Sequence, residues 1–324
     1  MSLLAQIRAS NAQLTEATTP GTAVLIGATD GIGKRALVTL VSHGFPLKAY
    51  VIGRNKARDQ TLLGELYAIN NKVELVYLEG QISLMSEVER LTSYILEKEQ
   101  KIDLLFHSAG FLPLLGRQET DEGLELSTAV AHFSRLAFIL RLLPRLQAAA
   151  KSGPEQYSPR IISILAAGNE SLDLFLNDLS LKEPGHFSVP IYARHVATMV
   201  TLSMKHLAEQ PGNEKIVAGA TGGDGAVPPA ATPSARPLSQ WTPEEAGEKA
   251  LYLMTSAEYG GKGVNVTEGR SAGLTVTHQI GESLFSVNDV MKNLQQDTLL
   301  ADLEAMGAQN AIWDYSVKTL APWL

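Results

Sequence analysis

The chain of 324 residues contains no cysteine, which excludes disulfide bonds and thiolate metal sites. It also lacks an excess of positive charge, because 27 Lys and Arg stand against 34 Asp and Glu, giving a formal net charge of −7. Nucleic acids and anionic membranes bind clustered Lys and Arg, so neither is expected as a partner. No His, Asp and Glu cluster has metal-ligand spacing, and no Gly-x-Ser-x-Gly elbow occurs, so neither a metal site nor a serine hydrolase is expected.

Long uninterrupted apolar runs are missing as well. The most apolar region, 133–146, is broken by Arg135, Arg141 and Arg145, so no membrane span is expected. The first residues have neither the basic start nor the apolar run of a signal peptide. We therefore expect a cytoplasmic protein, which agrees with the absence of cysteine.

Short apolar strands alternate with amphipathic helices along most of the chain. Strands are expected at 22–26, 48–52, 73–78, 102–106, 160–165 and 214–218. Helices are expected from Ile32 onward, at 57–70, 84–99, 125–150, 192–210 and 242–255, with one or two more in 287–315. Such alternation is typical of βαβ crossovers. It predicts an α/β fold with a doubly wound parallel sheet of the Rossmann type, in a single domain over residues 1–324.

Three segments lie outside this alternation. Residues 1–20 form an N-terminal extension, and residues 281–324 form a C-terminal extension that packs on the domain. Residues 219–240 are rich in Gly, Pro and Ala and follow the sixth strand, at the sheet edge where ligands bind. They are interpreted either as a substrate lid or as an ordinary surface loop.

A glycine-rich turn joins the first strand to the first helix. Its glycines allow the backbone to turn sharply and approach a pyrophosphate, and the helix N-terminus offers unpaired N–H groups to the anion. The residues of this turn that are expected to contact a dinucleotide are Gly27, Thr29, Asp30, Gly31, Ile32 and Gly33. The second strand ends in Arg54, and a basic residue there suits the 2′-phosphate of NADP, with help from Lys34 or Arg35.

The Gly-x-x-x-Gly-x-Gly spacing at 27–33 is that of the short-chain dehydrogenase/reductase family, which the chain resembles over nearly its whole length. Other landmarks that match are GRN at 53–55, HSAG at 107–110 and LLPRL at 142–146. GRQETDEGLE at 116–125, the HVATM helix and IWDYSVKTL at 312–320 resemble fungal members found in secondary metabolism. The resemblance implies NADP as cofactor, contacts from Arg54, Asn55, Ala109 and Gly110, and a homo-oligomer formed through the central helices.

The resemblance also locates the family's catalytic positions, and most of them are replaced. The catalytic serine falls on Ala166 or Ala167, the lysine on Val196, and the central-helix asparagine near Ala131. Only the tyrosine is retained, as Tyr192. A phenol has an unperturbed pKa near ~10, so without a neighbouring cation it is a poor acid–base group at neutral pH.

Polar residues that follow the fourth and fifth strands are expected to converge at the carboxyl edge of the sheet. Three of them are the candidates for acid–base chemistry, namely Tyr192, His107 and Glu170. Each also has a structural interpretation: a helix-start tyrosine, a hydrogen-bonded histidine, and a helix-start or solvated carboxylate. His195 projects about 100° away from the lysine position around the helix, so we interpret it as structural.

Three functions remain open at this point. The first is an atypical NADP(H)-dependent oxidoreductase that acts on a small apolar metabolite in fungal secondary-metabolite biosynthesis. The second is a non-redox enzyme on the same scaffold, a cyclase, isomerase or dehydratase, which the loss of serine and lysine motivates. The third is a catalytically inactive dinucleotide-binding protein. The intact phosphate turn and Arg54 place the oxidoreductase first.

Overall fold

The computed structural model describes residues 2–153, 155–222, 242–268, 270–277, 283–288 and 290–324. The segment interpreted as a lid, 219–240, lies outside the described residues except for 219–222, which are part of a strand.

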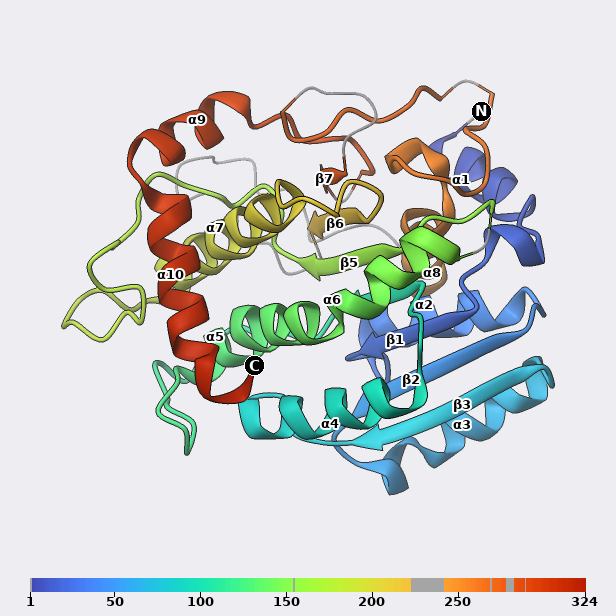
Figure 1. Ribbon diagram of the computed structural model, residues 1–324, viewed down its shortest axis with the longest axis horizontal. Helices are drawn as coiled ribbons and strands as arrows, with labels where there is room; N and C mark the ends of the chain where they lie inside the picture. The colour runs from blue at the N-terminus through green and yellow to red at the C-terminus, as the bar shows by residue number, and fades with distance from the viewer. Residues whose placement is uncertain (1, 154, 223–241, 269, 278–282, 289) are drawn as a thin grey trace.

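Seven parallel strands form one sheet in the order β3-β2-β1-β4-β5-β6-β7 (Figure 1). The strands are β1 (Thr22–Ile26), β2 (Leu47–Gly53), β3 (Val73–Glu79), β4 (Leu104–His107), β5 (Arg160–Leu165), β6 (Val217–Gly222) and β7 (Leu284–Val287). The direction of winding reverses between β1 and β4, so their carboxyl ends border a crevice. The predicted doubly wound parallel sheet is therefore confirmed.

The bounds of β2, β3 and β4 differ by one or two residues from the expected ranges, and two other strands differ more. β6 begins at Val217 rather than at 214, and it includes glycines that had been assigned to the loop. Gly219 fits there because a Cβ would come within 3.2 Å of Ile162 Cδ1 on β5. β7 was not expected at all: it has four residues, and 287 had been taken as the start of a helix. The helices of that region begin only at Asp297.

Helices cover both faces of the sheet (Figure 1). One face carries α1 (Leu3–Asn11), α2 (Gly31–Ser42), α3 (Lys56–Ile69) and α8 (Pro243–Thr255). The other carries α4 (Met85–Lys98), α6 (Ser134–Ser152), α7 (Val189–Ala208), α9 (Asp297–Ala305) and α10 (Ala308–Leu320). α7 begins before Tyr192 because the Ser188 side chain accepts the Ile191 N–H and caps the helix.

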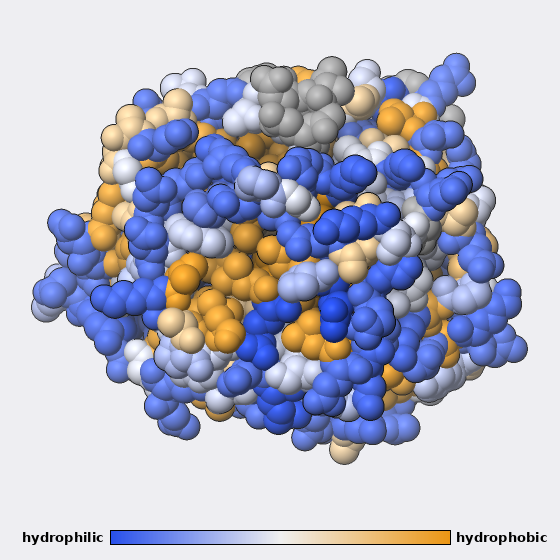
Figure 2. All heavy atoms as spheres, in the orientation of Figure 1, coloured by the Kyte–Doolittle hydropathy of each residue, from blue (hydrophilic) through white to orange (hydrophobic). Residues whose placement is uncertain are grey.

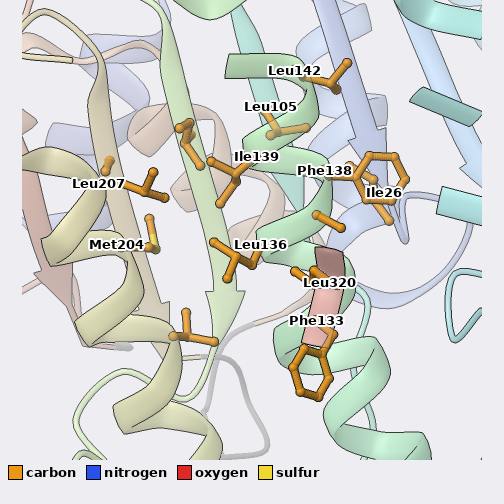
Figure 3. Close-up of a cluster of buried hydrophobic side chains, with 14 of the residues drawn as sticks. Ile26, Leu105, Phe133, Leu136, Phe138, Ile139, Leu142, Met204, Leu207 and Leu320 are labelled. Carbon is orange, nitrogen blue, oxygen red and sulfur yellow. The ribbon is translucent and has the colours of Figure 1, made fainter. Parts of the chain in front are cut away.

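A short turn, α5 (Leu126–Thr128), leads into a π-helical turn at Ala129–Phe133 and then into α6. Figure 3 shows the core that α6 forms with the sheet and α7. Leu136, Ile139 and Leu142 of α6 lie there with Met204 and Leu207 of α7, and all five side chains are buried. This core fixes α6 against the carboxyl ends of β4 and β5.

The C-terminal extension is part of the fold. α10 packs on α7, where Trp313 stacks on His206 with ring centroids 3.9 Å apart. His132 Nε2 and Ser316 Oγ lie 2.7 Å apart and join α10 to the π-helical turn. Arg141 donates to the Trp323 carbonyl over 2.6 Å. α10 therefore covers part of the α6 and α7 face, and Figure 2 shows apolar side chains on the same face of the molecule.

One helical run, Leu126–Ser152, is long and apolar enough by composition to cross a membrane, because the mean hydropathy of its most apolar 18-residue window is 1.3. The three arginines had argued against any such run. In the fold, 72% of its most apolar 18-residue window is buried inside the protein, so this helix belongs to the core.

Buried histidines predict a loss of stability in mild acid. Burial, aided by the charge of Arg135, lowers the pKa of His132 to about 3, and burial lowers that of His195 to about 4. Below the unfolded-state pKa near ~6.5 the unfolded chain binds protons that the folded chain refuses. We expect the free energy of unfolding in urea to fall between pH 7.5 and 5, by up to about 1.4 kcal/mol per pH unit for each histidine.

His132→Gln removes one of these histidines and should reduce that slope. An unfolding free energy that stays constant between pH 7.5 and 5 would contradict the burial of neutral imidazoles.

Candidate dinucleotide-binding site

A cavity of about 750 Å³ opens at the carboxyl edge of the sheet, where β1 and β4 part. Its walls come from the turns that follow four neighbouring strands and from the start of the central helix. The lining residues are Gly27, 29–33, 52–54, Arg58, 80–83, 108–111, Leu126, Val130 and Ile164. Most residues predicted to contact a dinucleotide therefore lie together here; the exceptions are Asn55 and the two residues expected to assist Arg54, Lys34 and Arg35.

Close packing explains the glycines of the turn. A Cβ at Gly27 would lie 2.5 Å from the Ala109 nitrogen, and one at Gly33 would clash with the Gly27 carbonyl oxygen and the Ser108 hydroxyl. Gly31 has a φ of +53°, which favours glycine. α2 begins at Gly31, whose N–H donates to the capping Asp30 Oδ1 at 2.8 Å, and the N–H groups of Ile32 and Gly33 have no acceptor within the helix. The turn can thus bring backbone N–H donors against a phosphate.

One end of the cavity carries two arginines. Arg54 and Arg58 both line it, and Arg58 Nη2 donates to Thr29 Oγ1 over 3.2 Å. The nearby Asp59 is buried and does not line the cavity, because it accepts hydrogen bonds from Arg58 Nε at 2.9 Å and the Tyr77 hydroxyl at 2.8 Å. The sequence analysis missed Arg58, although its position four residues after Arg54 at a helix start was a usable signal.

The other predicted residues near this end have structural contacts. Asn55 caps α3, where its side chain accepts the Arg58 N–H at 2.9 Å. Arg35 pairs with Glu244 at 3.3 Å, and neither Arg35 nor Lys34 lines the cavity. Gln81, Ile82 and Ser83 line it instead, and the end of β3 places them there.

The opposite end of the cavity is apolar. It is lined by Ala109, Phe111, Leu126, Val130 and Ile164. The Phe111 side chain is 46% exposed, and the same loop exposes Leu114 and Leu115. This end could accommodate an uncharged ring or an apolar substrate better than a charged group.

Tyr192 does not line the described part of this cavity. It is 3% exposed and packs with Ala131, Leu181 and Val196. Its hydroxyl donates to the Ser127 carbonyl over 3.2 Å. Burial, with a smaller contribution from Glu125, raises the pKa of this phenol. The phenol is therefore neutral at physiological pH.

His107 does not line the described part of the dinucleotide cavity, because its side chain packs against α6. It is 4% exposed, its Nε2 is 3.2 Å from Ser134 Oγ, and its ring edge meets Phe138. It borders a separate small cavity of about 20 Å³ between the sheet, α6 and α7. Burial lowers the pKa of His107 well below its usual value.

Glu170 and His195 have structural partners. The Glu170 carboxylate accepts hydrogen bonds from Thr201 Oγ1, Gln296 Nε2 and the Gly168 N–H, each over 2.7 Å. It therefore connects the loop after β5 to α7 and to the segment before α9. His195 Nε2 accepts the Phe175 N–H at 2.8 Å, which agrees with the structural role expected for it.

Arg135 is the charged group that the sequence analysis took only as an interruption of an apolar run. It is 2% exposed, and its guanidinium lies at the ends of β4 and β5. Its Nη2 donates to the carbonyls of Ile164 at 2.7 Å and Ala109 at 3.0 Å, and its Nε donates to Ser163 Oγ at 2.9 Å. It thus holds the backbone of Ala109 and Ile164, which line the apolar end of the cavity, from the side that faces the protein interior.

Comparison with known proteins agrees with this geometry. The model of the short chain dehydrogenase family matches residues 21–153. Oxidoreductase andH of Emericella variicolor is 31% identical over 98% of this chain and 97% of its own length. The NmrA-like family domain-containing oxidoreductase notO of an Aspergillus species is 31% identical over 91% of this chain and 87% of its own. The chain belongs to the short-chain dehydrogenase/reductase family.

Solved structures share the fold at low sequence identity. NADPH-bound carbonyl reductase from chicken fatty liver has a TM-score of 0.55 and 17% identity, covering 85% of this chain and 99% of its own. NADH-dependent reductase A1-R′ complexed with NAD has a TM-score of 0.54 and 18% identity, covering 76% and 92%.

Gly33→Ala tests the close packing of the turn. The added methyl group meets backbone at Gly27, so we expect a loss of about 1–3 kcal/mol in the free energy of unfolding. Gly64→Ala is the matched control, because a Cβ there meets nothing within 4 Å in α3 and should stabilise the protein by roughly 0.5–1 kcal/mol. Equal effects of the two substitutions in urea denaturation would refute the packing argument.

Proposed function

We propose that this protein is an NADP(H)-dependent oxidoreductase that acts on a small apolar metabolite. The proposal rests on the cavity. The glycine-rich turn 27–33 lines its middle, two arginines line one end, and apolar side chains line the other. A dinucleotide has the same order of parts: a 2′-phosphate, a pyrophosphate and an uncharged or singly charged ring.

The residues fit such a ligand part by part. Arg54 and Arg58 would hold the 2′-phosphate by charge-assisted hydrogen bonds. The first turn of α2 would hold the pyrophosphate. Ala109, Val130 and Ile164 would surround the nicotinamide end, and the ring, when bound, supplies the hydride chemistry.

Proton transfer needs a source other than the family's usual residues. The Tyr192 hydroxyl donates to the Ser127 carbonyl, the His107 side chain packs against Ser134 of α6, and the Glu170 oxygens accept from three donors. We therefore propose that water delivers the proton at the apolar end of the cavity. This arrangement suits a substrate whose anion, formed by hydride transfer, is stable enough to wait for a proton from water.

The second candidate function is dinucleotide binding without turnover. It is favoured by the finding that none of the three acid–base candidates lines the described part of the cavity. The non-redox alternative, which needed His107, Glu170 or Tyr192 as its acid–base group, has less support, because Glu170 holds α7 and the segment before α9 together and none of the three lines the described part of the cavity.

The setting of the protein is also a proposal. Its similarity to oxidoreductases of Aspergillus and Emericella supports a role in fungal metabolism, and we propose secondary-metabolite biosynthesis in the cytoplasm. A homo-oligomer would have to form beside α10, because this helix covers part of the α6 and α7 face (Figure 1).

Transfer of a deuterium label tests the function. NADPH deuterated at C4 of the nicotinamide, in either configuration, is incubated with the protein and a panel of apolar ketones, aldehydes and enones. We expect one configuration to pass its deuterium to a product. NADPH that binds in calorimetry but never transfers label to any substrate would favour the non-catalytic candidate.

Arg54→Ala and Arg58→Ala test the choice of NADP over NAD. Each substitution removes charge-assisted hydrogen bonds to the 2′-phosphate, so the dissociation constant for NADPH should rise roughly 10- to 100-fold. The constant for NADH, which has no 2′-phosphate, should stay nearly the same. Arg8→Ala, on exposed surface of α1, is the control. If the affinity for NADPH is unchanged in both variants, the 2′-phosphate does not bind at Arg54 and Arg58.

A further inference from the structure

The guanidinium of Arg135 is a buried positive charge without a negative partner among the described residues. Its acceptors are the Ser163 hydroxyl and the carbonyls of Ile164, Ala109, Ala131 and His107, which are all neutral. Burying a cation without a counter-charge is costly, and proteins usually pair such a group. This cost suggests that the charge has a use.

The neighbouring titratable groups leave that charge in place. Burial lowers the pKa of Arg135 to about 9, which still keeps the guanidinium protonated at neutral pH. His107 and His132 are neutral, because burial and the charge of Arg135 both lower their pKa values. The Tyr192 phenol is neutral as well. Glu125 is a buried carboxylate near the Tyr192 phenol, but its oxygens accept hydrogen bonds from Ser127 and Thr128 rather than from Arg135. The guanidinium is therefore the charge that directly contacts the ends of β4 and β5, and its own field there is positive.

This field acts on one end of the dinucleotide cavity. Ala109 and Ile164, whose carbonyls Arg135 binds, both line the apolar end. A dinucleotide with its 2′-phosphate at Arg54 and Arg58 has its nicotinamide at this opposite end. This step rests on the proposed function.

We propose that Arg135 makes the protein select the reduced dinucleotide, NADPH, over NADP⁺. The reduced nicotinamide is neutral, whereas the oxidised ring carries a positive charge that the guanidinium repels. Repulsion between two like charges is strong where water is excluded. Arg135 contacts the carbonyls of the cavity wall and acts through its field, so it is a positioning residue. The protein would accordingly take up NADPH and release NADP⁺, which is the order of a reductase.

Calorimetric titration of the wild-type chain with three probes tests the proposal without substitution. NADPH should bind at least about tenfold more tightly than NADP⁺. NADP⁺ should bind no more tightly than 2′-phospho-ADP-ribose, which lacks the nicotinamide. Equal affinities for NADPH and NADP⁺ would overturn the inference and leave the dinucleotide site standing. Binding of none of the three probes would overturn the proposed function itself.

Substitutions then assign the selection to the charge. Arg135→Met should bring the affinity ratio of NADPH to NADP⁺ down by about tenfold, whereas Arg135→Lys, which keeps a cation, should retain the preference. Arg141→Met is the control on the same helix, because Arg141 binds Thr92 Oγ1 and the Trp323 carbonyl instead. If Arg135 had only a structural role, Arg135→Met would weaken the binding of NADPH and of NADP⁺ by the same factor. An unchanged ratio of the two affinities in folded Arg135→Met would refute the proposal. If Arg135→Met does not fold by circular dichroism, loss of the preference in Arg135→Lys would refute it.

Discussion

The hydrogen bonds of Arg135 hold together the part of the structure on which the site depends. One guanidinium binds β5 through Ser163 and Ile164, the turn after β4 through Ala109, and the π-helical turn through Ala131. Ala109 in turn packs directly against Gly27, so the phosphate-binding turn is positioned by the same contacts. The cavity has a rigid wall because three strand ends and the central helix meet at these residues.

The same arrangement forms a cavity that fits a dinucleotide, although alanines and Val196 stand where the resemblance places the family's asparagine, serine and lysine. The face of α7 that would carry tyrosine and lysine is apolar at Val196, and Tyr192 turns its hydroxyl to the Ser127 carbonyl. Without the lysine ammonium, the positive charge near this end of the cavity comes from α6 instead of α7. The Arg135 guanidinium, which contacts the cavity wall from the protein side, would act on a bound ligand through its charge and would not exchange protons with it.

Much of the fold could be predicted from the sequence, because strand–helix alternation and the glycine spacing are local patterns. β7 could not, since a four-residue strand near a presumed helix has no periodicity of its own. The polar end of the cavity was largely predictable for the same reason, as every turn after a parallel strand lies at one edge. Arg58 and the residues after β3 follow from that rule, although only Arg54 was singled out.

The orientation of individual side chains was beyond sequence reasoning. Helical spacing places Tyr192 and Val196 on one face, but it does not show that the hydroxyl donates a hydrogen bond to the Ser127 carbonyl of another helix. His107 ends β4 as expected, yet side chains alternate along a strand, and its side chain points to α6 rather than into the dinucleotide cavity. Arg135 was misjudged because its partners come from 109, 163 and 164, which are distant in the sequence.

Hydrogen exchange measured with and without NADPH tests the central claim, that the cavity between β1 and β4 is the dinucleotide site. The account predicts slower exchange of the amides in 27–33, 53–58 and 108–111 when NADPH is bound. The surface pocket at the opposite edge of the sheet, around Lys151, Tyr157 and Lys262, should show no change. Protection at that pocket, or none in 27–33, would contradict the account.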